Sequence, residues 1–399
     1  MPSSVLRPIS LFSNLKKHRH ASWMELFIDL GFVIALSSLE SVFEKGINFH
    51  TVLIYIFLFF TVLWVWNRLT WYSSYYGNDD LLYRICYSIS LFLILGFSAA
   101  IPRIETGGYR ELIYWYLGIE VLLVLLWGRV LLSTKEFRKN NISFFLSYLT
   151  AFLIILFSLF MPLSIQLPLW LTAIFIEMIG PIIGWKREKG NISVHTPHIL
   201  ERHGLFMIIL LGEGLISVLT VLKHSFDFHS LLLGFLILCI LTLLWWLFFN
   251  DEYEEWTNLS QHISRTFIYG YGQFVIFIAI LLIIFSFNLN IHSTGDSHNS
   301  ESILNASRIL LFATGVYLFS LGFIQLLISD LKKLNPIYRF RIYTGIALLI
   351  LSSYPWNNFL LAVLISFFIL TGCLIHQYMV RRRIERKNVE EEIGSSSKK

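Results

Sequence analysis

Apolar side chains form long stretches of about twenty residues, and short polar segments separate these stretches along the whole chain. A helix of about 20 apolar residues covers the roughly 30 Å of hydrocarbon in a bilayer. The stretches lack the alternation that marks the strands of an outer-membrane barrel. The pattern predicts an all-α, polytopic transmembrane helix bundle with about twelve spans. The spans are expected near 22–43, 51–72, 83–101, 111–133, 143–161, 167–185, 203–222, 229–250, 265–288, 303–330, 338–354 and 357–380.

The composition excludes a water-soluble protein. Of the 399 residues, 56% are hydrophobic and 14% are charged, whereas soluble domains carry about 25% charged residues. The spans leave only short loops and two tails, so no soluble catalytic module is expected. The net charge of +5 comes from basic residues at span ends, so nucleic acid is not an expected partner. Cys86, Cys239 and Cys373 lie in apolar runs and are odd in number, so we expect packing roles and no disulfide framework.

The basic residues predict the orientation of the chain in the membrane. Lys and Arg near span ends collect on the cytoplasmic side. With twelve spans, all but five of the 31 basic residues fall on the side of the two termini. An even number of spans with both termini in the cytoplasm fits this asymmetry. Residues 1–21 and 381–399 are then cytoplasmic tails.

The two halves of the chain share a spaced pattern. Leu26-Phe27 and Leu205-Phe206 each precede a tryptophan pair, Trp64-Val-Trp66 in the first half and Trp245-Trp246 in the second. An acidic segment follows each pair, and the offset stays near 180 residues. We interpret residues 22–190 and 191–380 as two parallel six-helix repeats, which often enclose a path at their interface. Chance similarity between helices rich in Leu, Phe and Trp is the alternative.

Acidic residues inside the predicted spans are the first candidates for function, because an ionisable group in hydrocarbon is costly unless it faces a cavity or a partner. Glu25 and Asp29 are spaced i, i+4, so both carboxylates lie on one helix face and repel each other. A proton, a bound cation or an arginine must relieve that repulsion. For Glu25 a structural alternative exists, since Ser22-Trp-Met-Glu25 matches a capping box.

A second group of acids lies deeper in the chain. Glu213 is flanked by Gly212 and Gly214, which weaken a helix locally and open room beside the carboxylate, as in the discontinuous helices of transporters. Close helix packing is the structural alternative for the glycines. Glu177 precedes Gly180-Pro181, and Glu120 has no motif around it.

Basic and histidine residues supply candidate counter-charges. Arg68 lies near a helix end, so it either pairs with an acid or extends to the interface. Glu201-Arg202-His203 enters the seventh span, where the histidine is either a proton relay or a helix anchor. Histidines at 195, 198 and 203 do not have the spacing of a structural zinc site, so no metal is expected. No nucleophile elbow or H-E-x-x-H helix is present, so we expect neither an enzyme nor a cofactor.

Two long motifs carry a family resemblance. His20-Ala-Ser-Trp-Met-Glu25-Leu-Phe-Ile-Asp29-Leu-Gly-Phe-Val resembles the opening signature of the bacterial low temperature requirement A family. Glu201-Arg202-His203-Gly204-Leu-Phe-Met-Ile-Ile-Leu-Leu-Gly212-Glu213 resembles its second signature. Asn250 stands where the family pattern has aspartate, which puts any role of that position in doubt. The resemblance implies a bacterial inner-membrane protein linked to growth in the cold, and it assigns no reaction.

The buried acids suggest a function in moving a charged species. The leading hypothesis is a secondary transporter in which protons or a cation titrate Asp29 and Glu213 while the two halves rock around them. The alternatives are a passive ion channel and a non-transporting membrane partner or lipid-modifying protein, with Glu201-Arg202-His203 facing lipid headgroups. Expected partners are membrane lipids, a proton or small cation, and a small solute. Substrate, direction, stoichiometry and oligomeric state stay open.

Overall fold

The structure is a computed structural model that describes residues 20–43, 46–76, 80–106, 109–133, 135–187, 195–224, 226–250, 263–293, 300–329 and 332–396. Within these ranges the regular secondary structure is helical and no strand is present. Eleven of the described helices are long and apolar enough to cross a bilayer. The prediction of an all-α polytopic bundle is confirmed. The chain divides into two compact units, Met1–Phe206 and Met207–Lys399.

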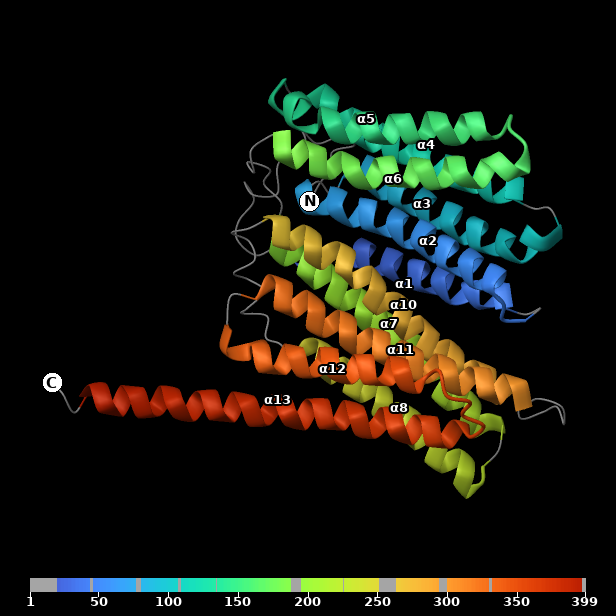
Figure 1. The fold of residues 1–399 in the computed structure, drawn as a ribbon. Coiled ribbons are helices and arrows are strands. Elements are labelled where there is room, and N and C mark those ends of the chain that lie inside the picture. Colours follow the sequence, from blue (N-terminus) through green and yellow to red (C-terminus); the bar gives the residue numbers. More distant parts are fainter. Residues whose placement is uncertain are drawn as a thin grey trace. The chain divides into compact units, whose positions relative to one another are not determined.

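In the described part of the first unit, α1 to α6 are complete and α7 begins (Figure 1). They are α1 (Trp23–Ser37), α2 (Phe49–Tyr75), α3 (Leu81–Ala100), α4 (Tyr109–Ser133), α5 (Lys135–Ser158), α6 (Leu163–Arg187) and the first turns of α7 (Thr196–His224). Short 3-10 segments, η2 (Ser38–Phe43) and η3 (Ile101–Thr106), follow α1 and α3. Consecutive helices from α3 to α6 pack against each other, and α1 packs on α3.

Helix α2 is the central element of the first unit. Every residue from Thr61 to Tyr75 is buried, so this stretch has no face toward solvent or lipid. Side chains or backbone atoms from α1, α3, α4, α6 and α7 make polar contacts with this helix. A helix that is buried all round belongs to the core of a bundle. Polar groups on α2 therefore lie where water is excluded.

The second unit contains the rest of α7 together with α8 (Phe228–Phe249), α10 (Ile263–Ser293), α11 (Ser300–Ile328), α12 (Asn335–Leu351) and α13 (Phe359–Ser396). A short 3-10 turn, η5 (Lys332–Leu334), precedes α12. Helix α11 packs on α10, α12 and α13, and α8 packs on α13. A Cβ atom added at Gly345 of α12 would lie 2.7 Å from the backbone nitrogen of Phe319 in α11. Small residues of this kind allow membrane helices to approach closely.

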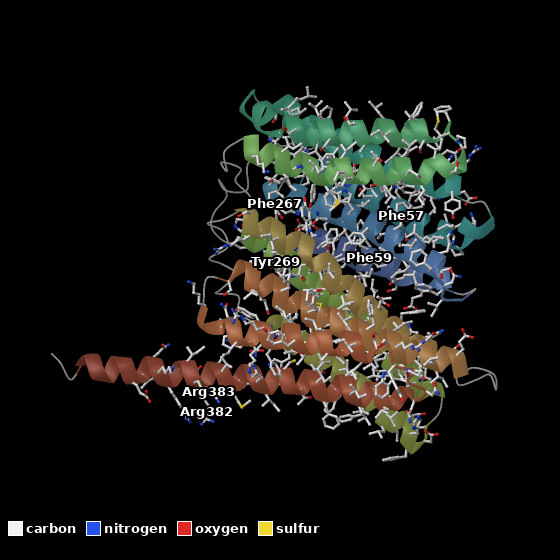
Figure 2. The ribbon with its side chains drawn as sticks, in the orientation of Figure 1. Phe57, Phe59, Phe267, Tyr269, Arg382 and Arg383 are labelled. Atoms are coloured by element: carbon white, nitrogen blue, oxygen red, sulfur yellow. The ribbon has the colours of Figure 1, made fainter. Side chains whose placement is uncertain are left out.

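Several helices differ in their bounds from the sequence-based prediction, and three of the differences bear on the argument. Helix α7 begins at Thr196 rather than near 203, so Glu201, Arg202 and His203 lie inside the helix. Helix α13 continues to Ser396 rather than ending near 380, and it carries Arg382 and Arg383 on its exposed C-terminal part (Figure 2). Helix α12 has 17 residues, about 26 Å at 1.5 Å per residue, and is the one predicted span that falls outside the eleven.

The predicted N-terminal tail lies mostly outside the described residues, and the two predicted repeats are not tested. Residues 1–19, which form most of the predicted N-terminal tail, lie outside the described residues. The boundary between the two compact units falls within α7, after Phe206. The two six-helix repeats stay a prediction. Cys86, Cys239 and Cys373 are all free thiols, as expected from their number and position.

Candidate functional site

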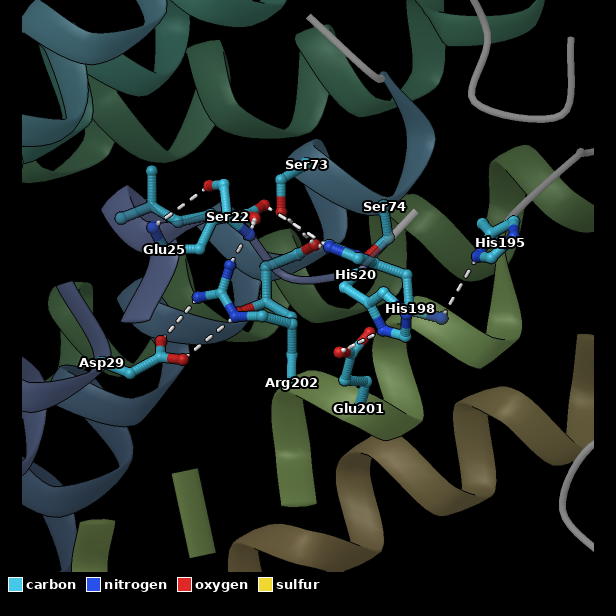
Figure 3. A network of polar contacts seen from close by, with 12 residues as sticks. His20, Ser22, Glu25, Asp29, Ser73, Ser74, His195, His198, Glu201 and Arg202 are labelled. Atoms are coloured by element: carbon cyan, nitrogen blue, oxygen red, sulfur yellow. Dashed lines mark hydrogen bonds and ion pairs between the residues drawn. The ribbon is translucent and has the colours of Figure 1, made fainter. Parts of the chain in front are cut away.

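Two clusters of buried charged groups lie in the first unit, and each combines two carboxylates with one guanidinium. The first, here named the Arg202 cluster, consists of Glu25, Asp29 and Arg202, all 0% exposed. Arg202 binds Asp29 through two contacts, Nη2 to Oδ1 at 2.5 Å and Nε to Oδ2 at 3.0 Å. Its Nη1 lies 3.3 Å from Oε1 of Glu25 (Figure 3). One arginine of α7 thus relieves the repulsion between the two acids of α1.

Glu25 has a structural and an electrostatic role at the same time. Its Oε2 accepts the backbone N–H of Ser22 at 2.6 Å, and the Ser22 hydroxyl accepts the Glu25 N–H at 3.3 Å. This is the capping box that the sequence predicts. The other oxygen, Oε1, faces Arg202, His198 Nε2 at 3.5 Å and the Tyr83 hydroxyl at 3.4 Å. Capping and charge pairing therefore use different oxygens of one carboxylate.

The Arg202 cluster connects to the surface along the first turns of α7. His198 is buried beside Glu25, and its Nδ1 lies 2.9 Å from the Ser74 hydroxyl of α2. One turn further on, Glu201 contacts His20 at 3.1 Å, and the side chain of His20 is 85% exposed. Figure 3 shows these residues gathered around the start of α7. One pair of titratable residues, His20 and Glu201, thus lies near the exposed rim, and His198 lies beside the buried carboxylate of Glu25.

The second group, here named the Arg68 cluster, consists of Arg68, Glu120 and Glu177, at most 1% exposed. Arg68 of α2 binds Glu120 of α4 through both terminal nitrogens, at 2.6 and 2.8 Å. Its Nη1 also donates to Glu177 of α6 at 2.5 Å. The guanidinium lies 5.7 Å from the ring centres of Tyr116 and Tyr148. Both carboxylates thus share a single positive charge at a buried position beside two aromatic rings.

Two tryptophans attach α2 to the two clusters. Trp66 Nε1 donates to Asp29 at 2.6 Å, and Trp64 Nε1 donates to Glu177 at 2.8 Å. Positions two apart on a helix point about 200° apart around its axis. The Trp64-Val-Trp66 motif therefore directs one indole to each cluster. Helix α2 lies between the Arg202 cluster on one face and the Arg68 cluster on the other.

The structure decides between the alternatives for Arg68. The side chain does not extend to the interface, because it is 1% exposed and held by two carboxylates. The interface interpretation is wrong because Glu120 and Glu177 supply a partner inside the bundle. Arg202, which stands one residue before the predicted span 203–222, is likewise fully buried in α7. His203 is buried too, and its Nδ1 donates to the Ile199 carbonyl at 2.8 Å.

The Gly212-Glu213-Gly214 segment differs from its prediction. Helix α7 runs without a break through all three residues, so it is not discontinuous there in the way of the transporter helices that the sequence suggested. Gly214 packs against Leu241 of α8, where an added Cβ would lie 2.6 Å from the side chain. An added Cβ at Gly212 would meet no atom within 4 Å. Glu213 is partly buried in the second unit, about 5 Å past the midpoint of the span Thr196–Lys223.

Sequence reasoning missed several groups at these sites. Glu120 had no motif, and His198 was considered only as a metal ligand. The spacing of Trp64, Trp66 and Arg68 carried a usable signal, since polar atoms recur there at i, i+2 and i+4 in a wholly buried stretch. Among the described residues, no group of three or more His, Cys, Asp or Glu is placed to hold a metal ion.

A buried arginine of the second unit was also missed. Arg341 of α12 is 0% exposed, although it follows a group of basic residues near the start of a predicted span. Its terminal nitrogens donate to the side-chain oxygens of Gln325 and Gln377. The sequence gives no signal for its burial. Lys332 and Arg339 stand close to it in the chain, and a run of basic residues near a span end is typical of a cytoplasmic loop.

The helices and the buried ion pairs define a polytopic membrane protein. The family model for the bacterial low temperature requirement A protein (LtrA) matches residues 20–379. The chain therefore belongs to this family, as its two motifs indicated. It is also similar to the uncharacterized protein RA0937 of Rhizobium meliloti (strain 1021), at 26% identity over 279 residues. That match spans 63% of this chain and 65% of the relative. No solved structure matches the chain.

Proposed function

We propose that this protein is a proton-coupled secondary transporter of the bacterial inner membrane that supports growth in the cold. The observation that supports this proposal is the ratio of charges in each buried cluster, two carboxylates to one guanidinium. The proposal keeps a small cation as the alternative coupling ion. It includes no enzymatic step.

The charge ratio favours a bound proton in each cluster. With both acids ionised, each triad of two acids and one arginine carries one uncompensated negative charge, and a buried unpaired charge costs several kcal/mol. Two carboxylates that share a site relieve this cost by holding one proton between them. In the Arg68 cluster that proton resides on Glu120 or Glu177. In the Arg202 cluster Glu25 and Asp29 share it, and His198 lies 3.5 Å from Glu25.

A proton held by such a cluster can be coupled to a change in conformation. Loss of the proton leaves a negative charge that the dry site does not tolerate, so water or a solute cation must approach, or the helices must rearrange. Ionisable groups inside membrane bundles commonly mark ion and proton paths for this reason. The pair of His20 and Glu201 at the rim and the pair of His198 and Glu25 inside support an entry route from this side of the Arg202 cluster.

The experiment uses proteoliposomes that contain the purified protein and a pH-sensitive dye. A proton gradient is imposed, and amino acids, sugars, nucleosides and alkali cations are added as separate pools. We expect one pool to raise the rate of proton entry. Glu177→Gln and Asp29→Asn should abolish that increase. Glu213→Gln should abolish it too if Glu213 titrates during transport, as the sequence predicts.

The matched control is Glu111→Gln, which makes the same chemical change at a side chain that is 46% exposed. It should leave the solute-dependent proton flux unchanged. If Glu177→Gln and Asp29→Asn transport as well as this control does, the proposed role of the clusters is wrong. Downhill cation flux that ignores the proton gradient would favour a channel. An altered lipid profile without any flux would favour a lipid-modifying or partner protein.

The proposed orientation places both termini in the cytoplasm. The basic residues support it, because all but five of the 31 lie on that side when twelve spans are counted. Helix α12 decides the count, since eleven spans would put the termini on opposite sides. A fluorescent protein that matures only in the cytoplasm, fused to the C-terminus, should fluoresce. A dark fusion at normal expression would contradict the twelve-span topology.

A further inference from the structure

Helix α13 is longer than a bilayer requires, and its extra length is basic. The apolar run 359–380 contains no Asp, Glu, Lys or Arg, and it covers about 33 Å at 1.5 Å per residue, close to the roughly 30 Å of hydrocarbon. Five of the next seven residues, 381–387, are Arg or Lys, and the helix continues through them to Ser396. This segment, here named the basic extension, therefore begins where the apolar run has crossed the hydrocarbon layer.

The neighbouring helix α8 places the membrane surface at the same level. Arg381 donates to the carbonyl of Asn250, the residue that caps the end of α8, at 2.9 Å. One turn deeper, the rings of Tyr378 and Trp246 lie 6.3 Å apart, and these side chains are 51% and 38% exposed. Exposed Tyr and Trp side chains are typical of the membrane–water interface. The basic extension thus starts in the layer of the lipid headgroups.

The basic extension has two different faces. One face packs on its own unit, because Val380 and Ile384 contact the apolar cluster around Tyr338 at the start of α12. The other face carries four exposed basic side chains, here named the basic face. They are Arg382, Arg383, Arg386 and Lys387. At about 100° per residue the four fall within a sector of about 140°. Figure 2 shows Arg382 and Arg383 on this part of the helix.

The basic face has no acidic partner in the part of the chain that the structure describes, since no ion pair there involves any of its four side chains. Two of its like-charged pairs are spaced i, i+4, where they repel each other and destabilise the helix. Glu385 lies outside the sector, and Glu390 lies about 4 Å further from the bilayer than Lys387. An anion bound from outside the chain would relieve this repulsion.

We propose that the basic face of α13 binds anionic phospholipids of the adjoining leaflet, of the phosphatidylglycerol class. Guanidinium groups bind phosphate through two parallel hydrogen bonds, and the lipid phosphates lie at the level where the basic extension begins. A zwitterionic headgroup fits less well, because its own ammonium group opposes the four cations. Four to eight Lys or Arg residues directly after a membrane helix are typical of binding to anionic lipid. In the proposed orientation this leaflet is the cytoplasmic one.

The arrangement goes beyond what membrane topology requires. Topology needs only an excess of Lys and Arg near a span end, which any loop can supply. Here a continuous helix holds four cations on one side, at the depth of the headgroups, while its other side is fixed to the unit by packing. A fixed cationic surface of this kind binds phosphate without the cost of ordering a loop.

The test compares two lipids with the same acyl chains and different headgroup charge. The purified full-length protein is incubated in detergent with equal amounts of phosphatidylglycerol and phosphatidylcholine, and bound lipid is counted by native mass spectrometry. The wild type should retain phosphatidylglycerol at least roughly tenfold more than phosphatidylcholine. Arg383→Gln should lower this ratio about fivefold, which corresponds to about 1 kcal/mol. Replacing all four residues of the basic face by Gln should remove most of the preference. A quadruple variant that keeps the wild-type ratio overturns the proposal.

Arg110→Gln is the matched control, because it makes the same change at another exposed arginine, in the first turn of α4. It should leave the lipid ratio unchanged. If it lowers the ratio as much as Arg383→Gln does, net charge sets the preference and the assignment to the basic face is wrong. Glutamine keeps a high helix propensity, so all variants should elute as the wild type does.

A further arm distinguishes lipid from an acidic protein as the partner. A labelled polyglutamate peptide is added to proteoliposomes that contain phosphatidylglycerol. No binding is expected, because the lipid occupies the basic face. Binding that the quadruple variant abolishes would assign the face to an acidic protein and overturn the proposal. The lipid site is independent of proton coupling, so its failure would leave the proposed transport function standing.

Discussion

Replacement of Arg68 by methionine removes the single positive charge that two buried carboxylates share. Methionine has a similar length and fills part of the same space. Arg68 donates two hydrogen bonds to Glu120, one to Glu177 and one to the Tyr116 hydroxyl at 3.2 Å. All three charged side chains are at most 1% exposed. The substitution therefore leaves two carboxyl groups facing each other without a cation or solvent.

The expected cost follows from this geometry. Removal of one partner from a buried ion pair typically destabilises a protein by about 3–5 kcal/mol, because the remaining charge is uncompensated. Exposed pairs contribute only about 0–1 kcal/mol. Arg103 and Glu111 form such a pair at 2.7 Å, with exposed fractions of 64% and 46%. Arg103→Met is therefore the matched control. The loss in free energy of unfolding should be at least about three times larger for Arg68→Met than for Arg103→Met.

The assay is denaturant titration of both variants in mixed micelles, followed by tryptophan fluorescence. Arg68→Met should unfold at a clearly lower denaturant concentration than the wild type, and Arg103→Met should be close to it. Adding Glu120→Gln and Glu177→Gln to Arg68→Met removes the uncompensated charge and should recover much of the loss. Equal stability of the two single variants, or no recovery in the triple variant, would refute the electrostatic account of this cluster.

Three more predictions concern packing, capping and hydrogen bonding. Gly345→Ala should destabilise the second unit by about 1–3 kcal/mol, because the new methyl group meets backbone atoms of α11. A Cβ added at Gly372 would meet no atom within 4 Å, so Gly372→Ala is the control and should be neutral or stabilising by up to about 1 kcal/mol when both variants are compared by thermal unfolding. Ser22→Ala should cost about 1 kcal/mol through loss of the α1 cap, and an unchanged melting temperature would contradict the capping box. Trp66→Phe should cost more than Trp71→Phe, since the first indole donates to a carboxylate and the second to an amide; equal losses in denaturant titration would oppose this.

The fold was predictable because hydrocarbon imposes a strong constraint on the sequence. Each of the twelve expected spans occurs as a helix among the described residues, since only helices satisfy backbone groups in lipid from such apolar runs. Boundaries were less accurate where polar residues continue a helix. The start of α7 at Thr196 and the end of α13 at Ser396 both lie in polar sequence, which hydropathy assigns to loops and tails.

The candidate site was predictable in its residues but not in their pairing. The cost of burial drew attention to Glu25, Asp29 and Glu177, and the i, i+4 spacing required a counter-charge for the first two. That Arg202 supplies it depends on how α7 packs against α1, which no local pattern encodes. Arg68 was ambiguous for the same reason, because its partner Glu120 is 52 residues away in sequence.

Infrared difference spectroscopy of the protonated carboxyl stretch tests the central claim most directly. The measurement uses the protein in lipid at neutral pH, with the isotope shift in heavy water to identify exchangeable carboxyl protons. The account predicts a protonated carboxyl signal in the wild type that persists in Glu111→Gln and disappears from the Arg68 cluster in Glu177→Gln. In that variant Arg68 and Glu120 form a balanced pair that holds no extra proton. A wild-type spectrum with only ionised carboxylates, or a signal that Glu177→Gln leaves unchanged, would contradict the claim that this cluster stores a proton.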